Sequence, residues 1–215
     1  DSKYLNALMK YKRVRKERNE LLGQIAEGGS SPDELEFWDS QLIELGSLIS
    51  QKRLEFTSYL NSKVPGIYKD ISQKDEEARI DYETNLKNIH SDSEKEEIER
   101  VFEAQLVSHR DQELRYENTV IGPHRDDLKF KIGRRNLPEM ASQGEIRSFA
   151  FALKLAEKSY LEEAAKEKVL FLIDDPLSEL DSMRTEYLLK VSHDEPVIIT
   201  ALDNEIKEID YKKQF

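Results

Sequence analysis

The sequence has 215 residues, which is enough to bury the core of one large domain or two small ones. Charged residues make up 36% and hydrophobic residues 38%, a balance that favours long solvated helices. Acidic residues outnumber basic ones by 44 to 33, and the net charge of −11 argues against a surface that binds nucleic acid throughout. The absence of cysteine excludes disulfides and thiolate metal sites and fits a reducing, cytoplasmic compartment, and no apolar run approaches the roughly 20 residues of a membrane span.

The N-terminal part of the sequence predicts two helices that fold back on each other. Large apolar side chains recur at spacings of three and four in both segments, and Arg15 and Arg18 interrupt the first seam. The seams consist of Tyr4, Leu8, Tyr11, Leu22 and Ile25, then of Leu35, Trp38, Leu42, Leu45, Ile49, Phe56 and Tyr59. Between them, Gly28 ends the first helix, and Ser31 with Glu34 forms a capping box for the second. The pattern predicts an antiparallel helical hairpin.

The middle of the sequence predicts a change of domain. "KVPGIY" (63–68) is expected to break the second helix, and "ARIDYET" (78–84) alternates as a short strand does. A third helix is expected to start after Asp92 or Ser93 and to run to about Asn118. The stretch 119–133 then predicts a β edge. We therefore expect a helical domain over 1–118 and a second domain over 119–215.

The second domain has an α/β pattern. A helix is predicted from Gln143 to about Ala165, an apolar strand at 169–173, a helix around 182–192 and a second apolar strand at 197–200. Continuous apolar strands separated by helices predict buried, parallel strands covered on both faces. The expected fold class is α/β plus a helical domain.

Two acidic residues, Asp174 and Asp175, follow the first apolar strand, at the end where open α/β sheets bind ligands. They are either structural caps of a strand end or oxygen ligands for a divalent ion such as Mg²⁺. Upstream, Ser142 and Gly144 open the predicted helix. They are either an ordinary N-cap or part of an anion site built from helix-terminal N–H groups.

Three motifs occur in order: "IGPHRDDL" (121–128), "ASQGEIRSFAFALKLAE" (141–157) and "LIDDPLSELD" (172–181). The last two resemble the signature motif, Walker B strand and D-loop of ABC-type ATPases. All three together resemble the RecF family, the recombination-repair branch of the SMC-like ATPases, over about residues 119–202. The helical hairpin lies where that family carries its lever-like domain.

The resemblance implies a role for each matching residue. Asp174 would act on Mg²⁺ through water, and Asp175 would be the catalytic carboxylate. Thr200 is the nearest candidate for sensing phosphate. The remaining ATP-binding positions, which face a second protomer, would be Ser142, Gln143, Gly144, Glu145, Ser178 and Asp181. The "HRDD" tetrad (124–127) is either a domain-coupling element or a salt-bridged turn.

The sequence contains no Gly-x-x-x-x-Gly-Lys-[Ser/Thr] motif, so it offers no cradle for a triphosphate. The resemblance then implies a fragment that lacks the N-terminal Walker A lobe. The intact protein would be a slow ATPase, and this chain alone is expected neither to bind ATP tightly nor to hydrolyse it.

The first 18 residues contain seven Lys and Arg residues against two acidic ones. Lys12, Arg13 and Lys16 are candidate contacts to DNA phosphates, although a solvated helix face with internal ion pairs is the more frequent explanation of such runs. The resemblance implies binding at single-/double-strand gap junctions, an ATP-dependent homodimer, and cooperation with RecR and RecO to load RecA. The alternatives are another SMC-like repair ATPase or a non-catalytic coiled-coil scaffold.

Overall fold

The computed structural model describes residues 1–174, 186–187, 190 and 196–200. The chain divides into two compact units. Unit 1 comprises Asp1–Ser58 and Asp81–Lys129, and unit 2 comprises Tyr59–Ile80 and Phe130–Phe215. The expected division into a lever domain and an ATPase lobe at 118/119 stays a prediction. None of the described helices is long and apolar enough to cross a membrane.

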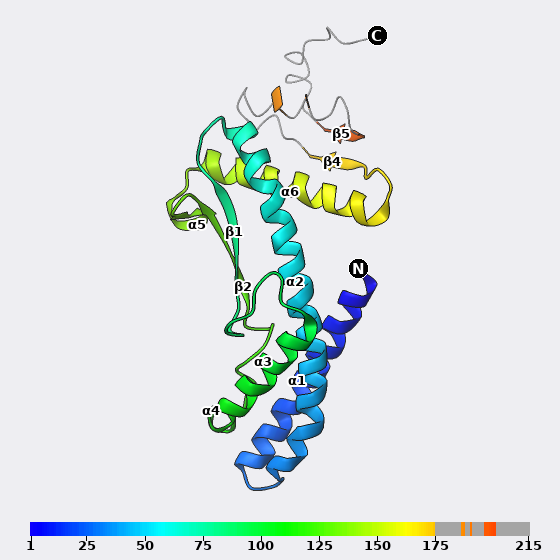
Figure 1. Ribbon diagram of the computed structural model, residues 1–215, viewed down its shortest axis with the longest axis vertical. Helices are drawn as coiled ribbons and strands as arrows, with labels where there is room; N and C mark the ends of the chain where they lie inside the picture. The colour runs from blue at the N-terminus through cyan, green and yellow to red at the C-terminus, as the bar shows by residue number, and fades with distance from the viewer. Residues whose placement is uncertain (175–185, 188–189, 191–195, 201–215) are drawn as a thin grey trace. The chain divides into compact units, whose positions relative to one another are not determined.

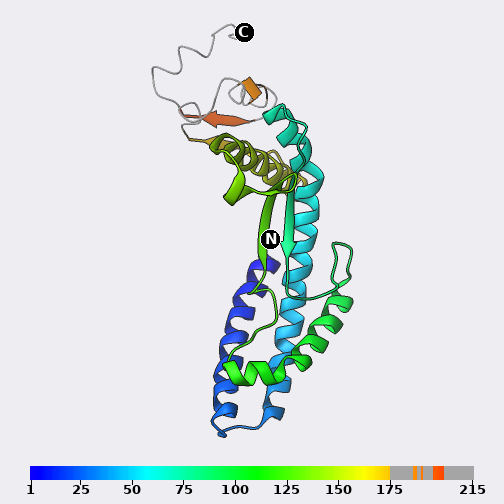
Figure 2. The ribbon, with the colours of Figure 1, turned by 90° about the vertical axis from the view of Figure 1, so that its left-hand side faces the viewer.

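Unit 1 is a helical unit that contains the predicted hairpin (Figure 1). Its elements are α1 (Ser2–Ala26), the 3₁₀ turn η1 (Pro32–Glu34), the first part of α2 (Leu35–Ser72), α3 (Lys95–Ser108) and α4 (Arg110–Tyr116). The Ser31 side chain accepts from the Asp33 N–H, and the Glu34 carboxylate accepts from the Ser31 N–H, so the predicted capping box is confirmed. Figure 2 shows α1 beside the first part of α2.

The core of unit 1 lies among α1, α2 and α3. Tyr11 and Leu42 contribute to it from the hairpin, and Ile98 and Phe102 from α3. Gly46 brings α2 close to α3, because a Cβ at this position would meet the Tyr11 ring at 3.1 Å and would clash with the Phe102 ring. Close packing of this kind fixes where the side chains of the neighbouring loop can lie.

The predicted break at 63–68 is wrong, because α2 continues through Pro65 to Ser72. A proline inside a helix removes the hydrogen bond to the carbonyl four residues earlier, here that of Asn61, at a cost of about 3 kcal/mol. The neighbouring side chains Val64, Tyr68 and Ile71 are buried. Burial of the Val64 and Ile71 side chains contributes about 1.5–3 kcal/mol each and offsets that loss.

The predicted third helix is present as two helices. α3 ends at Ser108 and α4 ends at Tyr116, with a break at His109, where φ is −104° and ψ is 6°. The His109 Nδ1 lies 2.8 Å from the Gln105 carbonyl, within the last turn of α3. The Gln105 carbonyl also accepts from the His109 backbone N–H at 3.0 Å, so the ring adds a second contact to this carbonyl at the end of α3.

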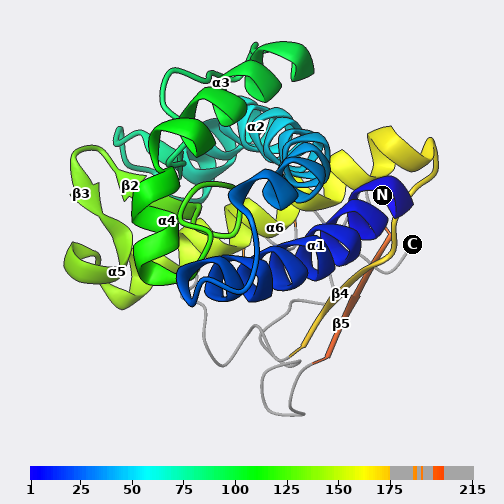
Figure 3. The same cartoon turned by 90° about the horizontal axis from the view of Figure 1, so that it is seen from below.

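The strands form two small sheets. β1 (Ala78–Glu83), β2 (Asp127–Ile132) and β3 (Arg135–Asn136) form a sheet in that order, and β2 pairs with β3 in antiparallel fashion. β4 (Phe171–Ile173) pairs with β5 (Val197–Ile199) in parallel, as predicted, with Phe171 opposite Val197 (Figure 3). Unit 2 also contains the end of α2, the short α5 (Leu137–Met140) and α6 (Gln143–Ala165), whose bounds match the prediction.

The expectation that the apolar strands are buried on both faces is wrong for the described residues. Leu172 in β4 is 67% exposed, and Ile198 in β5 is 52% exposed. A run of apolar residues shows that a strand favours burial, but it does not show which element covers it. The helix predicted around 182–192 lies largely outside the described residues.

Candidate nucleotide site and basic helix face

Asp174 and Thr200 follow the two parallel strands of unit 2 and meet at the same edge. β4 ends at Ile173 and β5 ends at Ile199, and these two residues are register partners. The Thr200 N–H donates to the Ile173 carbonyl at 3.0 Å, and the Thr200 hydroxyl donates to Asp174 Oδ1 at 2.6 Å. Both residues are exposed, so the carboxylate remains open to solvent. An exposed carboxylate held by a hydroxyl suits a hard cation that keeps its water ligands.

Three predicted site residues, Asp175, Ser178 and Asp181, lie outside the described residues. Their assignments as catalytic carboxylate and as D-loop contacts therefore stay predictions.

Ser142 caps α6, as the sequence predicts. Its hydroxyl oxygen accepts from the Glu145 N–H at 3.3 Å and donates to the Glu145 carboxylate at 3.0 Å. The same carboxylate accepts from the Ser142 N–H at 2.8 Å, which completes a capping box. Gln143 and Gly144 occupy the first turn, where N–H groups fall outside the helical ladder and the helix dipole favours an anion.

Two basic side chains converge on Glu145. Lys74 Nζ lies 3.0 Å from its carboxylate and Arg135 Nη2 lies 3.2 Å away, while Arg135 also pairs with Glu76 at 2.9 Å. The Ser142 N–H, followed by Arg135 and Lys74, holds the pKa of Glu145 far below its usual range. Lys74 lies 71 residues before Glu145, so no local pattern in the sequence identifies it as a partner.

This cluster affects how the start of α6 could receive a phosphate. Its two cations, Lys74 and Arg135, are balanced by two anions, Glu76 and Glu145. The Glu145 carboxylate also accepts a hydrogen bond from the Ser142 hydroxyl. A phosphate would therefore find helix-terminal donors there, but no excess of positive charge.

The basic run on α1 divides into exposed and buried members. Lys12, Arg13 and Lys16 are exposed, as DNA contacts must be. Arg18 is 0% exposed, so counting it in a basic surface patch is wrong. Arg18 occupies a position on the apolar seam of the hairpin, and its side chain therefore points into the interior of unit 1.

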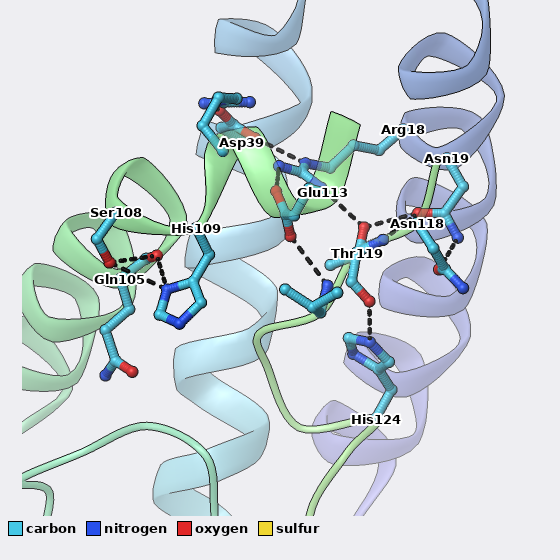
Figure 4. A network of polar contacts seen from close by, with 12 residues as sticks. Arg18, Asn19, Asp39, Gln105, Ser108, His109, Glu113, Asn118, Thr119 and His124 are labelled. Carbon is cyan, nitrogen blue, oxygen red and sulfur yellow. Dashed lines mark hydrogen bonds and ion pairs between the residues drawn. The ribbon is translucent and has the colours of Figure 1, made fainter. Parts of the chain in front are cut away.

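Arg18 holds unit 1 together through a polar network (Figure 4). Its Nε donates to Asp39 at 2.7 Å, its Nη1 to the Thr119 hydroxyl at 2.8 Å, and its Nη2 to Glu113 at 2.5 Å. Arg110 also pairs with Asp39. Burial alone would lower the pKa of Arg18, but the hydrogen bond to Glu113 and the two carboxylates raise it, so the guanidinium stays charged.

His124 and Asp126 of the "HRDD" tetrad lie in the same loop as Thr119, between α4 and β2. The Tyr11 hydroxyl and His124 Nδ1 are 2.8 Å apart, and His124 Nε2 lies 3.0 Å from the Thr119 carbonyl. Because a carbonyl only accepts, Nε2 carries the proton and Nδ1 accepts from Tyr11. Burial lowers the pKa of His124 to about 4, so the ring is neutral at pH 7.

Asp126 points into unit 1, and its side chain is 0% exposed. It accepts from the Tyr82 hydroxyl, and Arg53 Nη1 lies 3.9 Å away. Together, His124 and Asp126 connect the loop to α1, α2 and β1 within unit 1. The alternative role of the tetrad in domain coupling stays a prediction.

Comparison with known proteins agrees with the motifs. The curated DNA replication and repair protein RecF of Agathobacter rectalis is 36% identical over 209 residues, which cover 96% of this chain and 55% of the relative. RecF of Halothermothrix orenii is 35% identical over 202 residues, which cover 93% of this chain and 54% of the relative. The chain belongs to the RecF family. The chain thus spans about half the length of the RecF proteins that it matches, and no protein-family model matches the sequence.

Solved structures agree with this assignment. A structure described as the recombination mediator protein RecF-ATP in the RecFOR pathway matches with a TM-score of 0.82 and 32% identity. The match covers 95% of this chain and 54% of that one. A second RecF structure, with ATPrS, matches with a TM-score of 0.80 over 95% and 55% of the two chains. The family predicted from the three motifs is therefore confirmed.

Proposed function

We propose that this chain acts in DNA recombination and repair as the lever domain and signature-bearing lobe of a RecF-type ATPase. The observation that carries the proposal is the contact between Asp174 and Thr200 at the carboxyl ends of two parallel strands. It occurs in a chain that is 36% identical to a curated RecF protein. In an open α/β sheet, this edge is where ligands bind.

The residues that would serve ATP and Mg²⁺ form two groups. Asp174, exposed and fixed by the Thr200 hydroxyl, has the oxygen donor and the access to water that a Mg²⁺ ion requires. Gln143 and Gly144 offer N–H groups at the start of α6 for the γ-phosphate of ATP bound by a second copy. When bound, Mg²⁺ neutralises charge on the phosphates. Glu145 serves this group indirectly, because it holds the Ser142 cap in place.

In this proposal Asp175 orients the attacking water, and Ser178 and Asp181 contact the facing copy. ATP would therefore be held between two copies, and its hydrolysis would separate them. The alternative of a coiled-coil scaffold is disfavoured, since a scaffold has no need of the ordered set from Ser142 to Asp181.

The proposed partners follow from the family. A solved relative is described as a recombination mediator in the RecFOR pathway. We infer that the protein containing this chain binds DNA at gap junctions and acts with RecR and RecO, and through them with RecA. The lever domain over 1–118 and the lobe over 119–215 would be its two parts here.

The experiment is made in a protein of the relatives' full length that contains this chain. Asp175→Asn should keep ATP-driven dimerisation, measured by light scattering, and should nearly abolish ATP turnover. The control is Asp111→Asn, which removes an exposed carboxylate from α4 and should leave turnover unchanged. Normal turnover in Asp175→Asn would remove Asp175 from its assigned role.

A further inference from the structure

A pocket in unit 1 combines an apolar floor with three basic side chains. It is lined by Leu8, Tyr11, Lys12 and Arg15 from α1, Arg53 from α2, and Pro123 with His124 from the loop before β2, and its volume is about 270 Å³. The lining residues belong to three separate segments of unit 1. The pocket is therefore a product of the fold and not of one basic run in the sequence.

The three basic side chains differ in whether they already form hydrogen bonds or ion pairs within the chain. Within the described part of the chain, Lys12 and Arg15 form no hydrogen bond or ion pair. Arg53 donates through Nε to the Tyr4 hydroxyl at 3.1 Å and through Nη1 to the Pro123 carbonyl at 2.6 Å. These bonds fix the guanidinium at the pocket, while the carboxylate of Asp126, whose side chain is 0% exposed, lies 3.9 Å from it.

The neutral groups of the pocket keep its shape. Both ring nitrogens of His124 are engaged, one with the Tyr11 hydroxyl and the other with the Thr119 carbonyl. Neither nitrogen is left to contact a ligand, so His124 positions the wall. Gly122, with φ at +125°, lets the loop approach Tyr11, because a Cβ there would clash with the Tyr11 hydroxyl.

The charge of the pocket selects an anion. Lys12, Arg15 and Arg53 contribute three positive charges, and Asp126 offsets one of them, in a chain whose net charge is −11. Guanidinium and ammonium groups that meet at one point are the usual donors to phosphate oxygens. Leu8, Tyr11 and Pro123 provide an apolar surface against which a sugar ring can pack. A volume of about 270 Å³ suits a sugar-phosphate unit better than a larger cofactor.

We propose that this pocket binds a backbone phosphate of DNA and anchors the strand on unit 1. Lys12 and Arg15 contact the phosphate oxygens, and Arg53 supplies a fixed charge behind them. The proposal rests on the DNA binding of the proposed function but is independent of the ATP site. It also divides the basic run, because Lys12 lines the pocket whereas Lys3 and Lys10, on the same helix, do not.

The test is DNA binding by the 215-residue chain, measured as fluorescence anisotropy of a labelled duplex over a range of salt concentrations. Lys12→Gln should weaken binding about threefold to tenfold and should reduce the salt slope by about one, the change expected for one lost phosphate contact. Lys10→Gln is the matched control, because it removes the same charge from an exposed position of α1 outside the pocket. Equal effects of the two variants would overturn the proposal, because general attraction of DNA to a basic helix would then explain the binding without the pocket.

A second pair of variants tests Arg15. Arg15→Gln should act like Lys12→Gln, whereas Arg134→Gln, which removes an exposed arginine from unit 2, should not. Thermal unfolding of each variant shows whether the fold is retained, and the exposed Lys12 keeps the test valid if Arg15→Gln unfolds.

Inorganic phosphate, titrated at constant ionic strength, separates the possible sources of the ligand. If Lys12→Gln loses inorganic phosphate binding but keeps wild-type DNA affinity, the pocket takes a free anion, and the assignment to DNA is wrong. Failure of either test leaves the ATP-site proposal untouched, since turnover is measured separately.

Discussion

Replacing Arg18 with methionine should lower the free energy of unfolding by about 3–5 kcal/mol, because it breaks a buried ion pair and leaves one partner uncompensated. Arg18 and Glu113 are both 0% exposed, and their atoms lie 2.5 Å apart. Asp39 keeps Arg110 as a partner in the variant, so most of the cost falls on Glu113. Glu113 would retain only the Val120 N–H, which donates to its other oxygen at 3.0 Å.

Urea unfolding followed by tryptophan fluorescence measures this loss. Trp38 is the single tryptophan of the chain and packs against the hydrophobic clusters of unit 1, so its signal reports this unit. Adding Glu113→Gln should restore about 2 kcal/mol or more, because it removes the unpaired buried charge and keeps an acceptor for the Val120 N–H. Lys16→Met is the control, since Lys16 pairs with Glu20 at the surface and should contribute less than about 0.5 kcal/mol. A cost below about 1 kcal/mol for Arg18→Met, or no recovery with Glu113→Gln, would refute the reasoning.

Three further predictions concern the loop before β2 and the start of α6. Gly122→Ala should destabilise unit 1 by about 3 kcal/mol in the same urea assay, because φ is +125° and the new Cβ meets Tyr11 and Phe102; a loss below about 1 kcal/mol would contradict the packing. Stability should fall as the pH drops from 6.5 towards 4, because the unfolded chain then binds a proton that the buried His124, with a pKa of about 4, does not. His124→Asn should remove this part of the pH dependence, and an unchanged profile would count against the burial of the ring. Glu145→Gln should cost stability at pH 7, because the pKa of Glu145 is lowered in the folded chain and its ionised carboxylate therefore stabilises the fold. The difference in stability from the wild type should shrink as the pH falls below about 4.3, the ordinary pKa of a glutamate. A difference that is constant with pH would show that the Glu145 charge is not the source.

Features governed by neighbours along the chain could be predicted from the sequence. The hairpin follows from its apolar spacing, and the caps at Ser31 and Ser142 follow from the acidic residue three positions later. The pairing of β4 with β5 follows from two apolar runs separated by a connection long enough for a crossover.

Features that depend on partners distant in the chain could not be predicted. Pro65 continues a helix because buried neighbours offset the lost hydrogen bond. Arg18 is buried because Glu113 and Thr119, about 100 residues later, supply its acceptors. The exposure of Leu172 depends on what lies over β4, which its own apolar pattern does not specify.

The same division applies to the candidate site. Asp174 and Thr200 could be predicted together, since parallel strands that pair bring their carboxyl ends to one edge. Lys74 and Arg135 could not, because no motif connects them to the start of α6. The pocket beside Lys12 was also not predictable, because Arg53 and Pro123 reach it from other segments.

The most direct measurement for the shared ATP site is turnover in a mixture of two inactive variants, made in a protein of the relatives' full length. Asp174→Asn removes the proposed metal ligand, and Gly144→Asp places a carboxylate where the γ-phosphate would approach, at a helix position that tolerates an acid. Each variant alone should be inactive. If each site combines Asp174 of one copy with Gly144 of the other, a mixed dimer has one intact site, and random pairing of equal amounts restores about a quarter of wild-type turnover. No recovery in the mixture, with both variants folded and dimeric, would contradict the shared site.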